Sequence, residues 1–234
     1  MEFPGEERQE LSPRKIIRVA KDMLLKYGPR ENIKLEAENM RYVAESTTIP
    51  LPRVHEIQTH DSGVMSILMD YIEGQTLQNA WSCMTSSQKM SVSQELHEYI
   101  LQLRALRPEH GRRLIGEDIY IQHSACFDEY LFSRTAMSIP GVGRDFVSIK
   151  WPEDGVVFTH GDLAPRNILV DDHGHITAIL DWEFAGWHPE WWETVRAYTF
   201  CNDVPGWTAY LSAVFPPDHD TEYMAMAFAR HILR

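Results

Sequence analysis

The chain has 234 residues, of which 44% are hydrophobic and 24% charged, proportions typical of a globular protein with a sizeable core. Its 22 Lys and Arg against 34 Asp and Glu give a net charge of −12, which disfavours binding to nucleic-acid backbones and anionic membranes. No apolar run approaches the roughly 18 residues of a membrane span, and the polar N-terminus shows no secretory signal. Three scattered cysteines without metal-ligand spacing indicate reduced thiols, so we expect a cytoplasmic protein.

The first third of the chain has a strand-rich pattern interrupted by one helix. Short apolar and β-branched runs bounded by turn signals favour strands, and the apolar spacing in 35–45 favours a helix. Pro50 and Pro52 end that helix and begin an extended segment. The predicted strands are 15–20, 23–27, 55–60 and 64–69.

The middle and the end of the chain are predicted to be mainly helical. The run from Thr85 to Gln88 has the pattern of a capping box, in which the first and last residues satisfy each other's backbone amides. A helix is therefore expected from there to about Leu106, and its apolar residues recur at the spacing of a buried face. Further helices are predicted at 127–133, 190–202, 207–215 and 221–233, with a loop over the site at 135–149.

The most informative stretch runs from residue 156 to residue 183. A polar loop, 160–167, follows one predicted strand and precedes a hairpin, because Gly and Pro break regular structure within the loop. The hairpin returns Asp181 to the side of the loop that holds Asp162 and Asn167. The predicted strands are 156–158, 168–170 and 175–180, with a turn at 171–174.

Two carboxylates and a carboxamide at this spacing suit phosphoryl transfer. That reaction needs a carboxylate to orient or deprotonate the attacking hydroxyl, and oxygen ligands for the Mg²⁺ that bridges nucleotide phosphates. We therefore predict Asp162 as the catalytic base and Asn167 and Asp181 as metal ligands. A base five residues before an Asn, then a hairpin and a metal-binding Asp, is also the order in the protein-kinase catalytic loop. His-Gly-Asp alone would leave open a loop whose carboxylates are merely solvated.

The run HGDLAPRNILVDDHGHITAILDWEFAGWHPEWWE resembles the catalytic core of the aminoglycoside phosphotransferase family, and in particular its fungal kinase-like members. The resemblance implies an α+β, protein-kinase-like bilobal fold with an abbreviated N-terminal β lobe and a mainly helical C-terminal lobe. It places a nucleotide lobe with its hinge at 1–72 and a catalytic lobe at 73–234. It also implies ATP and Mg²⁺ as cofactors and a small-molecule hydroxyl as the acceptor.

The same resemblance assigns an ion pair to the N-terminal lobe. DMLLKYG is similar to the family strand that carries a phosphate-contacting lysine, which makes Lys26 the candidate and Lys21 its rival. The predicted helix at 35–45 resembles the helix whose glutamate pairs with that lysine. Glu36 is favoured for this role because it stands four residues before an apolar position, and Glu38 is the alternative.

The run SILMDYIEGQTL is similar to the kinase hinge between the lobes. Backbone groups from Asp70 to Ile72 are expected to bind the adenine edge, and Met69 to floor or gate the pocket. The alternative for Met69 is a role in the core only. In the resemblance His160 packs beneath the catalytic loop and the position of Arg166 varies, so direct chemistry is the less favoured reading of both. The tryptophans after residue 181 are predicted to be core residues.

One departure from the kinase pattern leaves a second function open. Kinase-like folds usually cover the phosphates with a glycine-rich turn between their first two strands, and this chain has only Gly5 before Lys26. The leading prediction is an ATP- and Mg²⁺-dependent phosphotransferase acting on a small-molecule hydroxyl. The alternative is a kinase-like protein that no longer uses ATP and serves as a binding module or a repurposed biosynthetic enzyme. A protein kinase is disfavoured because no activation segment ending in Ala-Pro-Glu is recognisable.

Overall fold

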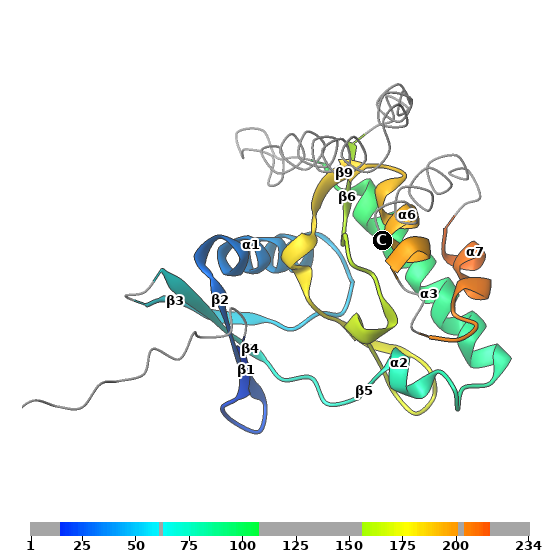
Figure 1. The fold of residues 1–234 in the computed structure, drawn as a ribbon, viewed down its shortest axis with the longest axis horizontal. Helices are drawn as coiled ribbons and strands as arrows, with labels where there is room; N and C mark the ends of the chain where they lie inside the picture. Colours follow the sequence, from blue (N-terminus) through cyan, green and yellow to red (C-terminus); the bar gives the residue numbers. More distant parts are fainter. Residues whose placement is uncertain (1–14, 61–62, 108–155, 201–203, 216–234) are drawn as a thin grey trace, which may run out of the picture.

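A computed structural model describes residues 15–60, 63–107, 156–200 and 204–215. Figure 1 shows a sheet with one long helix on one side of the molecule and further helices on the other, with the strands that follow residue 156 between them. The predictions for 127–133, 135–149 and 221–233 lie outside the described residues.

The N-terminal part is a four-stranded antiparallel sheet covered by one helix. The strands follow the order β1-β2-β4-β3, and the register places Lys26 opposite Ile67. Their bounds are β1 Lys15–Arg18, β2 Met23–Pro29, β3 Val54–Thr59 and β4 Val64–Asp70. The four predicted strands are confirmed.

Helix α1 (Arg30–Ser46) packs on this sheet and begins earlier than the predicted Leu35. Pro29 is its N-cap residue and connects β2 directly to the helix. Among residues 30–34, which precede the predicted start, only Ile33 is a buried apolar residue. Apolar spacing therefore gave no signal for the first turn of the helix.

The second part contains two small sheets and several helices. β5 (Gln75–Thr76) joins the predicted hairpin of β7 (Ile168–Val170) and β8 (Ile176–Ile179), whereas β6 (Val156–Thr159) pairs with β9 (Gly186–Pro189). The helices are α2 Leu77–Ala80, α3 Ser86–Ala105, α6 Trp192–Phe200 and α7 Leu211–Val214. Short 3₁₀ turns are η1 Pro165–Asn167, η2 Trp182–Phe184 and η3 Thr208–Tyr210.

Two of the predicted helices differ from the structure. β9 ends at Pro189 and residues 190–191 form a turn, so the helix predicted from residue 190 begins at Trp192. The predicted helix 207–215 is broken into η3 and α7, because the Tyr210 amide donates to Trp207, three residues back, whereas the Phe215 amide donates to Leu211, four residues back. Buried Trp207 and Leu211 stand at helical spacing, which made the two turns look continuous.

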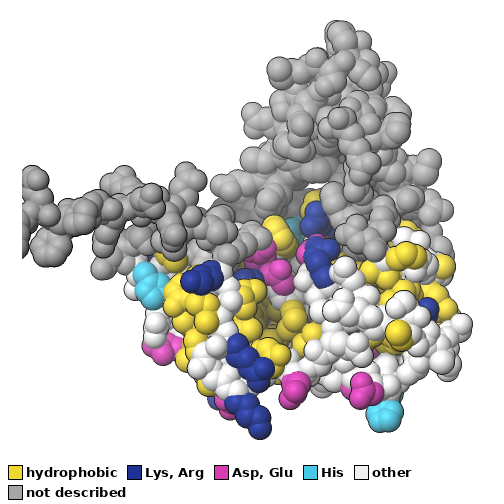
Figure 2. Space-filling view, turned by 60° about the horizontal axis from the view of Figure 1, so that its bottom comes forward, with side chains coloured by type: hydrophobic (Ala, Val, Ile, Leu, Met, Phe, Trp, Pro, Cys, Tyr) yellow, Lys and Arg dark blue, Asp and Glu magenta, His cyan; other side chains and the backbone are white. Residues whose placement is uncertain are grey.

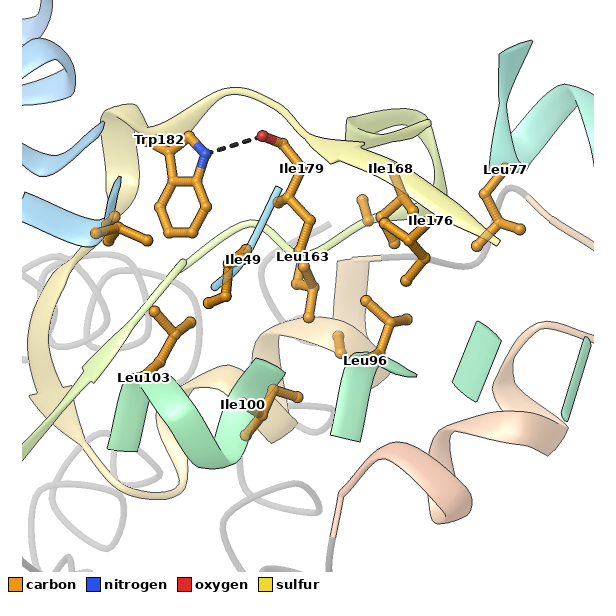
Figure 3. Packing of buried hydrophobic residues seen from close by; sticks show 14 of the residues in the cluster. Ile49, Leu77, Leu96, Ile100, Leu103, Leu163, Ile168, Ile176, Ile179 and Trp182 are labelled. Carbon is orange, nitrogen blue, oxygen red and sulfur yellow. Dashed lines mark hydrogen bonds between the residues drawn. The ribbon is translucent and has the colours of Figure 1, made fainter. Parts of the chain in front are cut away.

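The core lies beneath the loop between β6 and β7. Figure 3 shows Leu163 of this loop among apolar residues of α3 and of the β7–β8 hairpin. The predicted capping box is present at the start of α3, with reciprocal bonds between Thr85 and Gln88. Trp182 is fully buried, and its indole N–H donates to the Ile179 carbonyl at 3.0 Å. The predicted core role of the tryptophans holds for Trp182, Trp187 and Trp191, which are all buried, whereas Trp192 is only half-buried.

Within the described ranges, no helix has both the length and the apolar character needed to span a bilayer.

Candidate active site

A cavity of about 350 Å³ lies between the N-terminal sheet and the β7–β8 hairpin. Figure 2 shows a hollow with hydrophobic side chains inside it and with acidic and basic side chains together at one end. Leu24 of β2 and Leu169 of β7 are among its apolar walls. The cavity also brings together every residue predicted to contact nucleotide or metal, namely Lys26, Glu36, Met69, Asp70, Ile72, Asn167 and Asp181.

Lys26 is a buried cation at the charged end of the cavity. Residues two apart on a strand share a face, so Lys26 faces the cavity together with Leu24. Its Nζ donates to Glu36 Oε1 at 2.8 Å and to Asp181 Oδ1 at 2.7 Å. Of the two candidate glutamates, Glu36 is thus the one beside Lys26, whereas Glu38 lies 3.9 Å from Lys34.

The three charges influence one another strongly. Burial raises the pKa of Glu36 to about 7, although Lys26 opposes the shift. Burial alone would lower the pKa of Lys26, but Glu36 and Asp181 outweigh it and raise this pKa above its usual value. Lys26 therefore stays charged at neutral pH, and the site keeps a fixed cation for an anionic ligand.

The hinge offers part of its backbone to the cavity. The Asp70 amide donates to Arg53 and the Tyr71 amide donates to Asp22, at 3.1 and 2.8 Å. Among the described residues, the Ile72 amide makes no backbone hydrogen bond. The Asp70 carboxylate accepts the Arg53 amide and lies 2.6 Å from the His55 ring. The backbone from Asp70 to Ile72 therefore borders the cavity, and within the described residues the Ile72 amide there has no backbone partner.

Asp162 lies in the loop between β6 and β7 and is only 7% exposed. Its Oδ2 accepts the Asn167 amino group at 2.9 Å and the Arg166 guanidinium at 2.6 Å, and its Oδ1 lies 3.5 Å from Arg196 Nη2. Asn167 also donates to the Asp162 carbonyl at 2.9 Å. Because the amino group of Asn167 is committed to Asp162, its carboxamide oxygen is left for a ligand in the cavity.

Two backbone positions in the site have conformations that few residues adopt. Gly161 has φ of +78°, and a Cβ there would lie 2.3 Å from the Phe184 carbonyl oxygen. Asp181 has φ of +65°, the one non-glycine residue with positive φ among the described residues. For a residue with a Cβ such a conformation costs about 1–3 kcal/mol, and such residues cluster at functional sites, where surrounding contacts hold them. Asp181 is such a residue, and Gly161 directly precedes Asp162.

A buried carboxylate that sequence reasoning missed holds the catalytic loop. Glu193 of α6 is 2% exposed and accepts the His160 amide at 2.6 Å and the Gly161 amide at 3.1 Å. The His160 ring lies beneath the loop, as the resemblance implied, with Nδ1 accepting the Asp162 amide at 3.2 Å and Nε2 lying 2.9 Å from the Leu180 carbonyl. His160 thus positions the loop from below.

Asn39 ties α1 to the turn that follows Asp181. Its Nδ2 donates to the Trp182 carbonyl at 3.1 Å and to the Ala185 carbonyl at 2.7 Å. Asn39 stands three residues after Glu36, and residues at this spacing share a helix face. A polar residue on an otherwise buried helix face is the feature of the sequence that could have identified Asn39 as a site residue.

The donor set fits Mg²⁺ shared with a nucleotide. Asn167 and Asp181 line the cavity and supply oxygen ligands, the type that Mg²⁺ prefers. No three His, Cys, Asp or Glu side chains gather as a metal site in the part of the chain that the structure describes. Mg²⁺ usually completes its shell with water and substrate phosphates, so one carboxylate and one carboxamide suffice.

Comparisons with known proteins agree with this geometry. The model of the phosphotransferase enzyme family APH matches residues 10–220. Clavilactone A biosynthesis cluster protein Y of Ampulloclitocybe clavipes is 29% identical over an alignment of 222 residues. The match covers 75% of this chain and 53% of that protein. The chain thus spans about half the length of this fungal relative.

Several solved structures share the fold. The gentamicin complex of APH(2″)-IIa has a TM-score of 0.71 and 12% identity, with 93% of this chain and 77% of that chain covered. The GDP and kanamycin complex of APH(2″)-IIIa has a TM-score of 0.66 and 16% identity, with 99% and 83% covered. The ADP-bound APH(2″)-Ib has a TM-score of 0.68 and 11% identity, with 94% and 82% covered.

These likenesses confirm the α+β, kinase-like fold with a small N-terminal sheet and a largely helical second part. With its family model matched over residues 10–220, the chain belongs to the phosphotransferase enzyme family.

Proposed function

We propose that this protein transfers the γ-phosphoryl group of ATP to a hydroxyl of a small molecule, with Mg²⁺ as cofactor. The observation that carries the proposal is the arrangement at the charged end of the cavity. There Lys26 bridges Glu36 and Asp181, and Asn167 connects the cavity to the carboxylate of Asp162. The nucleotides in the similar structures, GDP and ADP, support nucleotide use by this fold.

Each side chain has a role that follows from its contacts. Asp162 orients the acceptor hydroxyl and takes its proton, a task for a positioned carboxylate. Lys26, braced by Glu36, binds the phosphates as a point charge. Asn167 and Asp181 would hold Mg²⁺ through their side-chain oxygens, and the bound ion would supply positive charge to offset the charge of the phosphates.

The hinge and the apolar walls would hold the base of the nucleotide. The Asp70 carbonyl and the Ile72 amide are the acceptor and the donor that an adenine edge can match. Met69 is 7% exposed and lines the cavity beside them, in keeping with a role at the base. We further propose that the nucleotide lobe ends at this hinge, with the division at residue 72.

One observation favours a second function, that of a kinase-like protein that no longer uses ATP. The turn between β1 and β2, Val19 to Asp22, contains no glycine and bonds to the hinge through the Tyr71 amide. Such a turn cannot wrap the phosphates as closely as a glycine-rich one, because side chains restrict how near its backbone comes to a ligand. The relative from a biosynthesis cluster would be compatible with either function.

Thermal unfolding with nucleotide distinguishes the two functions. A ligand at a hundredfold excess over its dissociation constant stabilises the native state by about 2.7 kcal/mol. For a chain of this size, each kcal/mol of stabilisation raises the melting temperature by roughly 2–4 °C. ATP with Mg²⁺ should therefore raise the melting temperature by several degrees. EDTA should remove most of the rise, as should Asp181→Ala, which deletes the carboxylate ligand.

The control is Asp172→Ala, an exposed carboxylate in the turn between β7 and β8. This variant should respond to ATP and Mg²⁺ as the parent does. A melting temperature that stays flat up to millimolar ATP, in a cooperatively folded parent, would favour the second function. With binding established, ATP consumption should be screened against alcohols, amino alcohols and aminoglycosides to find the acceptor.

A further inference from the structure

We propose that Arg166 contacts the phosphoryl group during its transfer and is a catalytic residue of the reaction proposed above, on which this inference rests. Arg166 lies in η1 between the predicted base and the predicted metal ligand Asn167 in sequence. Its Nη2 donates to Asp162 Oδ2 at 2.6 Å, and its side chain also lines the nucleotide cavity. It is therefore in contact with both sides of the reaction centre.

The path of the transferred group passes this guanidinium. Phosphoryl transfer keeps the attacking and leaving oxygens roughly in line with phosphorus. The leaving oxygen belongs to a nucleotide whose phosphates lie at the charged end of the cavity, near Lys26 and Asp181. The attacking oxygen lies at Asp162. The phosphorus must therefore move between the cavity and Asp162, the region that Arg166 lines on one side and contacts on the other.

The charge balance of the site calls for such a cation. Lys26 already contacts two carboxylates, those of Glu36 and Asp181, at 2.8 and 2.7 Å. Lys26 thus divides its hydrogen bonds between two carboxylates before any phosphate binds. Arg166 brings a further positive charge, and its planar donors match phosphate oxygens in pairs.

The neighbouring arginine is placed differently. Arg196 of α6 donates through Nε to the Gly161 carbonyl at 2.9 Å and lies near the rings of Phe184 and Trp192. Arg196 thus helps to hold the loop between β6 and β7 in place. The Arg166 side chain is 45% exposed, against 21% for Arg196, so it can turn towards a ligand without unpacking the core.

The step in which Arg166 acts is balanced as follows. The acceptor hydroxyl oxygen forms a bond to the γ-phosphorus while its proton passes to Asp162. The bond from that phosphorus to the bridging oxygen breaks, and its electron pair remains on the β-phosphate of ADP. The equatorial oxygens carry the charge in between, and Arg166 donates to one of them in place of Asp162 Oδ2. An arginine in this role contributes up to about 10³–10⁵-fold in rate in other phosphoryl-transfer enzymes.

A transition-state mimic tests the role without knowledge of the acceptor. Fluoroaluminate with ADP and Mg²⁺ imitates the phosphoryl group in transfer, whereas ADP with Mg²⁺ leaves that place empty. Melting temperatures would be measured for the parent, Arg166→Ala and Arg166→Lys with each mixture. We expect Arg166→Ala to keep the ADP shift and to lose about 10²-fold or more of the added affinity that fluoroaluminate gives the parent. Arg166→Lys should recover part of it.

The matched control is Arg41→Ala, which removes an exposed arginine of α1 outside the cavity. It should keep both shifts. If Arg166→Ala retains the full fluoroaluminate increment, or if the parent binds ADP and gains nothing from fluoroaluminate, the role of Arg166 is wrong while nucleotide binding stands. If the parent shows no shift with ADP or ATP, the proposed function itself fails, and the role of Arg166 with it.

Discussion

The two halves of the candidate site hold their charges in different ways. On the nucleotide side, Lys26 and Glu36 project from a strand and a helix, so regular hydrogen bonding fixes their backbone. On the loop side, Asp162 and Asp181 lie on irregular backbone: Gly161, which precedes Asp162, has positive φ, and so does Asp181 itself. There the backbone is held by buried side chains from other elements, above all Glu193.

This difference separates local from distant determinants of the site. A strand or helix positions its side chains by periodicity, so changes elsewhere leave the geometry of the nucleotide side largely intact. The loop side depends on single hydrogen bonds to backbone amides, and the loss of one leaves a buried group without a partner. We therefore expect substitutions on the loop side to have the larger effects, and the following experiments test that expectation.

The largest effect is expected for Asp162→Asn. The amide keeps the shape of the side chain but cannot accept the hydroxyl proton, so phosphoryl transfer should fall by about 10²–10⁴-fold. Initial rates would be compared for variant and parent with an acceptor that the parent phosphorylates. The rise in melting temperature that ADP causes would check that the variant is folded. A variant that kept more than about a tenth of the parent rate would remove Asp162 from the role of base.

Gly161→Ala should come next, through stability. Positive φ costs an alanine roughly 1–2 kcal/mol, and overlap with the Phe184 carbonyl adds on the order of 1–3 kcal/mol. Gly206 offers a matched control, since it has the same φ of +78° with no atom within 4 Å of the added Cβ. Urea unfolding of Gly161→Ala and Gly206→Ala would separate backbone strain from crowding. Equal losses would contradict the close approach at the loop.

Lys26→Met should have a smaller effect on the reaction, seen as weaker binding of the nucleotide. Loss of a charged hydrogen-bond donor costs about 1.5–3 kcal/mol, so the dissociation constant of ATP with Mg²⁺ should rise roughly 10- to 100-fold. Lys21→Met, at an exposed position of the β1–β2 turn, should leave it unchanged. Titration calorimetry gives both constants, and a greater sensitivity at Lys21 would reverse this assignment.

The smallest effect concerns the pH dependence of stability. Because the pKa of Glu36 is raised to about 7 in the folded state, the folded protein retains a proton that the unfolded chain loses. The resulting stabilisation is fully present below the unfolded pKa, near 4.5, and is lost as the pH rises through about 7. Glu36→Gln should remove this decline, which amounts to no more than a few kcal/mol.

Unfolding free energies of parent, Glu36→Gln and Glu38→Gln at pH 5 and pH 7.5 provide the measurement. Glu38 lies on the same helix, with its carboxylate 3.9 Å from Lys34 Nζ, and Glu38→Gln is the matched control. An equally steep decline in the parent and in Glu36→Gln would mean that another group is responsible.

Much of the architecture around the site could be predicted from the sequence. The hairpin that returns Asp181 to Asp162 follows from short β-branched runs around a turn, and the start of α3 follows from its capping box. These signals are local, since each lies within a few residues of the element it specifies. The functional roles of Lys26, Glu36, Met69, Asp70, Ile72, Asp162, Asn167 and Asp181 remain predictions, although the structure places them around one centre.

What the sequence did not reveal depends on contacts between distant residues. Glu193 lies more than thirty residues from the amides it accepts, and no periodicity connects it to the loop. Strand β9 was missed because it pairs with β6 across a similar separation, and its four residues give no strand signal of their own. Arg166 was recognised as a residue of interest, but only the structure shows its guanidinium beside both Asp162 and the cavity.

The bonds from Asn39 have a consequence for how the chain folds during synthesis. Its two acceptors, the carbonyls of Trp182 and Ala185, are 143 and 146 residues further along the chain. Asp181 is likewise 155 residues from Lys26. A ribosome adds about 5–20 residues each second, so many seconds pass between the synthesis of α1 and that of these partners. During that interval water takes the place of these acceptors at Asn39 and Lys26, and the bonds between the two parts of the molecule form only after residue 185 has emerged.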